Sequence, residues 1–144
     1  MDTVKKSSPG KEHVLHVKKL ALIGAGKLGE ALLSGILSSQ LVPASRVEAT
    51  VAHQPRADAL KEKYGIKAHT ENSKAVAGAD LVVIAAPMGA YKAIAAVVGP
   101  ALAPGAIVTD VGSVKGVLAA TASQFSYSQK LVYIEMFPNI CKPC

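Results

Sequence analysis

The stretch LALIGAGKLGEALLSG, residues 20–35, decides the fold of this 144-residue chain. It begins with a short apolar run, continues through Gly24, Gly26 and Gly29, and then shows helical spacing of apolar residues. A short apolar run next to glycines is typical of a buried strand, whereas a 3.6-residue period is typical of a helix. The stretch therefore predicts a strand, a tight glycine turn and a helix in direct succession.

The same alternation continues to the end of the chain. Apolar, β-prone runs predict strands at 19–24, 46–52, 66–70, 80–87, 106–112 and 130–137. Helices are expected between them at 27–39, 55–64, 72–78, 90–99 and 113–124. Strands that alternate with helices indicate a parallel sheet covered on both sides. We therefore predict an α/β fold: a doubly wound, Rossmann-type sheet of about six mainly parallel strands, with helices on both faces.

Local signals suggest where several of these helices begin and which way they face. Pro55 suits the first turn of the second helix, and Gly65 suits its end. Asn72 or Ser73 is expected to cap the third helix. One face of the first helix is formed by Leu28, Ala31, Leu32 and Gly35.

The glycine turn has the spacing G-x-G-x-x-G, which binds dinucleotides when it joins a first strand to a first helix. Gly24 would permit the tight turn, Gly26 would let backbone amides approach a pyrophosphate, and Gly29 would let the helix lie close to the strand. The helix amino terminus adds the positive end of a dipole. The expected contacts within the loop are Gly24, Ala25, Gly26, Lys27, Leu28 and Gly29.

The end of the second strand indicates which dinucleotide is bound. NAD sites usually place an acid there, which accepts hydrogen bonds from the ribose hydroxyls. This chain has instead His53, Gln54 and Arg56, and its one nearby acid, Glu48, lies early in the strand. A guanidinium can pair with a phosphate, so these three residues favour NADP over NAD. A solvated Arg56 on the first turn of a helix is the alternative.

The carboxyl ends of the later strands are the other expected part of the site, because ligands of doubly wound sheets bind there. Small residues after the fourth strand, Ala85, Ala86 and Pro87, would let the backbone approach a ribose and nicotinamide, or would simply form a tight turn. After the fifth strand, Ser113 and Lys115 are candidate catalytic residues. Ser113 is equally suited to cap the next helix.

Composition narrows the class of protein. Half of the residues are hydrophobic, and the net charge of +6 comes partly from five lysines in the first 19 residues. Basic residues are not interleaved with aromatics, which argues against a nucleic-acid partner.

We expect no metal site, because the histidines lack ligand spacing, and no role for Cys141 and Cys144. The absence of a long apolar run and of a disulfide framework favours a cytoplasmic protein without membrane association.

Residues 18 to about 85 resemble the N-terminal domain of pyrroline-5-carboxylate reductase. The resemblance rests on the segments GEALLSGIL, QLVP and YGI followed by T-x-N. It implies that Asn72 contacts the cofactor and that the turn from His53 to Arg56 holds the 2′-phosphate of NADPH. It also implies a hydride transfer from NADPH to the C=N carbon of a cyclic imino acid, which yields proline.

The next part of the chain is similar to another family. The segments APMGAY and PGAIVTDVGSVKG resemble prephenate and arogenate dehydrogenases, in which the serine matching Ser113 lies by the catalytic centre. The chain departs from that family because no histidine follows His69. It departs from the reductases because AAPMGAY replaces their Lys-Pro pair, and EMFPNI replaces their Met-Pro-Asn-Thr.

Both families add a mostly helical domain that forms the dimer and closes the substrate site. We expect that domain to be absent, leaving a flexible basic leader at 1–17 and an NADP-binding domain at 18–144. The expected function is the cofactor half of a proline-forming reductase, weak or inactive alone and prone to self-association. The alternatives are the cofactor domain of a prephenate or arogenate dehydrogenase, and a non-catalytic dinucleotide-binding or interaction module.

Overall fold

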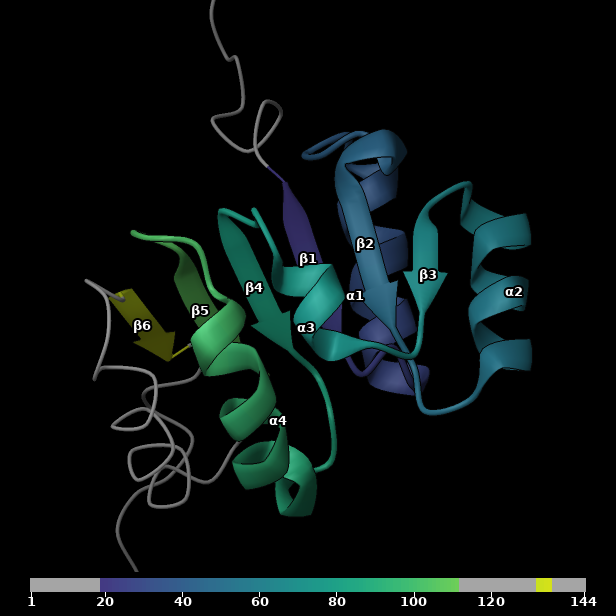
Figure 1. Ribbon diagram of the computed structural model, residues 1–144. Helices are drawn as coiled ribbons and strands as arrows, with labels where there is room; N and C mark the ends of the chain where they lie inside the picture. The colour runs from purple at the N-terminus through teal and green to yellow at the C-terminus, as the bar shows by residue number, and fades with distance from the viewer. Residues whose placement is uncertain (1–18, 112–131, 136–144) are drawn as a thin grey trace, which may run out of the picture.

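A computed structural model describes residues 19–111 and the backbone of residues 132–135. Within these residues the strands form one six-stranded sheet in the order β3-β2-β1-β4-β5-β6 (Figure 1). Every neighbouring pair is parallel, which confirms the predicted fold class. The strands are β1 (Leu20–Ile23), β2 (Val47–Thr50), β3 (Lys67–His69), β4 (Leu81–Ile84), β5 (Ile107–Asp110) and β6 (Val132–Glu135).

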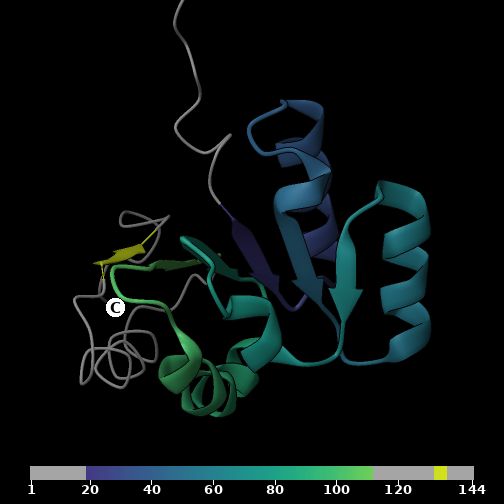
Figure 2. The same cartoon turned by 45° about the horizontal axis from the view of Figure 1, so that its top comes forward.

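Helices cover both faces of the sheet (Figures 1 and 2). They are α1 (Lys27–Ser38), α2 (Gln54–Tyr64), α3 (Asn72–Val76) and α4 (Tyr91–Val98), with short 3-10 turns η2 (Ala44–Arg46), η3 (Met88–Ala90) and η4 (Gly99–Ala101). Successive side chains of a strand point to opposite faces. Leu20 and Leu22 of β1 therefore join one core with α1 and α2, whereas Ala21 and Ile23 join a second core with α3 and α4.

The orientation of α1 differs from the expected one. Its fully buried residues are Gly29 and Leu33, whereas Leu28 is 60% exposed. The predicted face was wrong by about one position, because the close approach at Gly29 turns that glycine toward the sheet. Leu28 is thereby left at the mouth of the turn, where it lines a pocket.

The ends of α2 agree with the sequence, and the start of α3 does not. Pro55 lies in the first turn of α2, and Gly65 ends it in the left-handed region with φ +68°. For α3, the residue before the first turn is Glu71, and no side chain caps the helix. The amide of Asn72 accepts a hydrogen bond from Thr50 Oγ1 instead, so the predicted cap was wrong.

The strand order brings the functional candidates to one edge of the sheet. From β1 the chain proceeds outward to β2 and β3, then crosses back to place β4 on the other side of β1. The carboxyl ends of β2, β1 and β4 therefore lie side by side at the reversal of strand order, where doubly wound folds bind ligands. Outside the described residues lie the expected leader at 1–17, the helix at 113–124, Ser113, Lys115, Cys141 and Cys144.

Candidate functional site

The glycine turn packs directly against the end of β4. Gly24 has φ +84°, and a Cβ atom added to it would lie 2.8 Å from the Ala86 Cα. A Cβ atom on Gly29 would lie 2.8 Å from the carbonyl oxygen of Gly24. No atom lies within 4 Å of the corresponding position on Gly26. Two glycines therefore permit close packing, while the third leaves the backbone open on its outer side.

Thr50, at the carboxyl end of β2, anchors the turn. Its carbonyl oxygen accepts hydrogen bonds from the amides of Gly24 and Ala25, at 3.1 and 2.8 Å. Its hydroxyl accepts a longer one from the Gly24 amide, at 3.3 Å, and donates to Asn72 Oδ1 at 2.7 Å. Thr50 is only 1% exposed. A partly buried side-chain network therefore links α3 to the first glycine of the turn.

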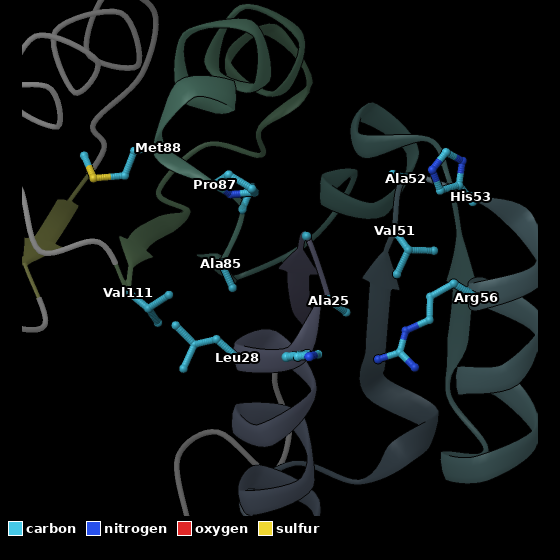
Figure 3. A pocket seen from close by; sticks show the side chains of 14 residues that line it. Ala25, Leu28, Val51, Ala52, His53, Arg56, Ala85, Pro87, Met88 and Val111 are labelled. Atoms are coloured by element: carbon cyan, nitrogen blue, oxygen red, sulfur yellow. The ribbon is translucent and has the colours of Figure 1, made fainter.

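A pocket of about 580 Å³ lies between this turn and the ends of β2 and β4 (Figure 3). One side is apolar, with Leu28, Ala85 and Val111 close together in Figure 3. The opposite side carries His53 and Arg56, which come from the start of α2. The residues that line the pocket are Gly24, Ala25, Gly26, Lys27, Leu28, Val51, Ala52, His53, Arg56, Ala85, Ala86, Pro87, Met88 and Val111.

Arg56, on the polar side, has a partner within the protein. Its Nη2 donates to the carboxylate of Glu30, in the first turn of α1. Lys63 and Tyr64, near the end of α2, donate to the other oxygen of Glu30, each at 2.9 Å. Hydrogen bonds from Lys63, then Arg56 and then Tyr64, lower the pKa of Glu30 to about 2. Glu30 therefore remains a carboxylate that ties α1 to α2.

Glu48, the acid of β2, takes no part in the pocket. It is 7% exposed and pairs with Lys19 Nζ at 3.0 Å and with His69 Nε2 at 2.6 Å. The Glu71 amide donates to His69 Nδ1, so Nε2 carries the proton donated to Glu48. Burial alone would raise the pKa of Glu48, but the hydrogen bonds from His69 and Lys19 outweigh it and lower the pKa. The Glu48 carboxylate therefore has its hydrogen-bond partners within the protein, in Lys19 and His69.

A buried phenol contacts the backbone at the end of β4. Tyr91, the first residue of α4, donates its hydroxyl to the carbonyl oxygen of Ile84 at 3.2 Å. Burial, and secondarily the nearby charge of Asp110, raises the pKa of the Tyr91 hydroxyl far above its ordinary value. Asp110 is itself 1% exposed at the end of β5. Tyr91 therefore stays neutral and supports the backbone where β4 ends.

The structure gathers most of the predicted binding residues around one pocket and leaves three outside it. Gly29 packs beneath the turn, Gln54 donates to Asp58 at 3.0 Å, and Asn72 bonds to Thr50. Sequence reasoning missed four lining residues, although each lies at the end of a predicted strand or within one residue of that end. These are Val51, Ala52, Met88 and Val111.

Neither a cluster of metal ligands nor a membrane-spanning helix occurs in the described part of the chain. Within residues 19–111, no three His, Cys, Asp or Glu side chains are grouped so that they could hold a metal ion. No helix in this part is long and apolar enough to cross a membrane.

Comparisons with known proteins point to oxidoreductases. The chain is 30% identical over 95 residues to pyrroline-5-carboxylate reductase of Pseudomonas aeruginosa, a match that covers 66% of this chain and 34% of the relative. The chain spans about a quarter to a third of the curated reductases it matches, from 24% to 34%.

Solved structures share the fold. One is the pyrroline carboxylate reductase of Plasmodium falciparum with NADP bound: its TM-score is 0.66 at 15% identity, over 83% of this chain and 42% of that one. Another is arogenate dehydrogenase of Synechocystis, with a TM-score of 0.64 at 25% identity, over 77% of this chain and 38% of that one.

These likenesses agree with the geometry of a glycine turn between β1 and α1, at the edge where dinucleotides bind. A family model described as "NADP oxidoreductase coenzyme F420-dependent" matches residues 19–113, which include the whole pocket. The chain therefore belongs to this family of NADP oxidoreductases.

Proposed function

We propose that the pocket binds NADP(H), and that the chain provides the cofactor half of a reductase acting on a cyclic imino acid. The observation that carries the proposal is the polar side of the pocket. It is formed by His53 and Arg56, with no acidic side chain among the described residues that line the pocket, although Glu30 lies behind Arg56. An NAD site would offer a carboxylate to the ribose hydroxyls here, whereas cations suit a 2′-phosphate.

The rest of the pocket supports an orientation of the cofactor in which the 2′-phosphate lies near Arg56. The pyrophosphate would lie against Gly26 and the amino terminus of α1, where the backbone is open and the helix dipole favours an anion. The adenosine end would extend toward Arg56 and His53. The nicotinamide end would lie on the apolar side, between Ala85 and Val111.

In the proposed reaction NADPH, when bound, would supply the hydride that reduces the C=N carbon of the imino acid, and a proton added to the ring nitrogen would complete proline. The small and apolar residues on the apolar side of the pocket would position the nicotinamide. Among the described residues, this side holds no side chain suited to bind a substrate carboxylate or to protonate a ring nitrogen. From these residues we expect binding of NADPH with slow or no reduction of the imino acid; a rate near that of a full-length reductase, measured on the 144-residue chain, would contradict this.

A second candidate is the cofactor domain of a prephenate or arogenate dehydrogenase. The segment TDVGSVKG, residues 109–116, and the 25% identity to the Synechocystis enzyme favour it. The chain has no histidine after His69 to serve as that family's catalytic base. The reductase remains the better-supported proposal, because curated pyrroline-5-carboxylate reductases match 45% to 66% of this chain at 30% to 37% identity.

Parallel fluorescence titrations with NADPH and NADH test the proposal. We expect tighter binding of NADPH, and Arg56→Ala should weaken NADPH binding while leaving NADH binding unchanged. Arg46→Ala is the matched control, since it removes the same charge at the opposite end of β2. Equal or tighter NADH binding would overturn the NADP assignment. Binding of neither dinucleotide would favour a non-catalytic interaction module.

A further inference from the structure

Glu30 and Arg56 form an ion pair at the edge of the dinucleotide pocket. Arg56 lines the pocket from α2, and its Nη2 atom is bonded to the Glu30 carboxylate on α1. The side chain of Arg56 is 41% exposed, whereas that of Glu30 is 18% exposed. The cation expected to receive a 2′-phosphate is therefore already engaged by an anion of the protein itself.

A ligand phosphate and the Glu30 carboxylate would draw on the same guanidinium. Charged hydrogen bonds to a guanidinium are strongest when two of its donors face one anion, and a donor committed to Glu30 is not available to a phosphate. The remaining carboxylate would also repel a phosphate brought close to it. NADH carries no such phosphate, so neither effect acts on it.

Glu30 has other hydrogen-bond partners that remain when Arg56 moves away from it. Lys63 Nζ and Tyr64 Oη are bonded to its other oxygen, each at 2.9 Å, and they come from the far end of α2. When Arg56 turns to a ligand, the carboxylate therefore keeps a cation and a hydroxyl as partners. An isolated carboxylate left without partners would oppose that movement.

Resting on the proposed NADP(H) binding, we propose that Glu30 is a specificity-determining residue that competes with the 2′-phosphate for Arg56 and limits the preference for NADPH over NADH. The competition is internal to the protein, and its strength is set by a charge on α1 rather than by an acid at the end of β2. Discrimination between the two dinucleotides is thus shared between two helices.

Glu30→Gln tests the proposal, because it removes the charge and keeps the shape of the side chain. From the strength of partly exposed ion pairs, we expect NADPH affinity to rise about three- to fivefold, with NADH affinity unchanged. The readout is the dissociation constant for NADH divided by that for NADPH, and this ratio should rise in Glu30→Gln. If the substitution only loosened the contact between α1 and α2, the binding of both dinucleotides would weaken equally and that ratio would stay unchanged.

Two further variants make the result specific. Asp58→Asn removes the same charge from α2, where the carboxylate is bonded to Gln54 and Lys61, and should leave the ratio as it is. In an Arg56→Ala background, Glu30→Gln should change the ratio of dissociation constants little, because the guanidinium for which Glu30 and the phosphate compete is absent.

An unchanged or lower ratio in Glu30→Gln would overturn the proposal, a lower ratio showing that Glu30 orients Arg56 for the phosphate. A full effect that persists in the Arg56→Ala background would overturn it as well. Failure of the unmodified chain to bind either dinucleotide would instead remove the proposed function, and this inference with it. The two failures are therefore distinguishable in one set of titrations.

Discussion

Alanine substitutions at Gly24 and Gly26 should separate the folding role of the glycine turn from its binding role. Gly24→Ala places a Cβ atom 2.8 Å from the Ala86 Cα at φ +84°. The left-handed backbone costs about 1–2 kcal/mol for a residue with a Cβ, and overpacking against a backbone atom costs about 1–3 kcal/mol more. We therefore expect the free energy of unfolding to fall by about 2–5 kcal/mol, a large share of a typical domain's stability.

Gly26→Ala is the matched substitution, because nothing lies within 4 Å of its added Cβ atom and φ is −73°. Its effect on the free energy of unfolding should stay below about 1 kcal/mol. That Cβ atom would nevertheless extend into the open space where we place the pyrophosphate. NADPH affinity should therefore fall at least about tenfold, equivalent to 1.4 kcal/mol.

Urea unfolding followed by circular dichroism measures the stability of both variants, and NADPH fluorescence measures binding by Gly26→Ala. Equal loss of stability in the two variants would refute the steric account of Gly24. Unchanged NADPH affinity in Gly26→Ala would refute the placement of the pyrophosphate, since the variant alters little else.

Two further predictions concern buried and charged groups around the turn. Thr50→Val keeps the volume but removes the hydroxyl bonded to Asn72 and Gly24, and should lower the free energy of unfolding by about 1–2 kcal/mol in the same urea assay; no loss would show that the carbonyl bonds alone hold the turn. The Glu30 pKa, lowered from 4.5 to about 2, is a source of stability that is present above pH 4.5 and lost as the pH falls toward 2. Urea midpoints measured from pH 6 to pH 2 should therefore fall less steeply in Glu30→Gln than in the unmodified chain, and parallel slopes would contradict this.

The sequence was sufficient to predict the order of the described strands and α-helices, though not the three 3-10 turns, for reasons visible in particular residues. Strands such as Leu20–Ile23 and Leu81–Ile84 are covered on both faces, so they consist almost wholly of apolar residues and are recognised without knowledge of their neighbours. Gly65 marks the end of α2 because its left-handed backbone is a local requirement. Such signals are contained within a few residues.

Features that depend on partners distant in the sequence were not predictable. The polar side of the pocket was inferred from His53, Gln54 and Arg56, whereas Glu30, the partner of Arg56, lies 26 residues earlier and on another helix. Asn72 has the chemistry of a helix cap, but a hydroxyl from β2 competes successfully for its amide oxygen. The rotation of α1 follows from the contact of Gly29 with Gly24, which no periodicity of α1 itself reveals.

The alternation of β1 between the two cores has a consequence for how the molecule opens. Leu20 and Leu22 belong to one core and Ala21 and Ile23 to the other, so neither core remains complete when this strand separates from the sheet. Local opening of α2 or α4 can leave the opposite face intact, but opening of β1 exposes both faces at once. In amide hydrogen exchange, β1 should therefore exchange only through global unfolding. A dinucleotide bound at its carboxyl end would slow that exchange on both sides of the sheet together.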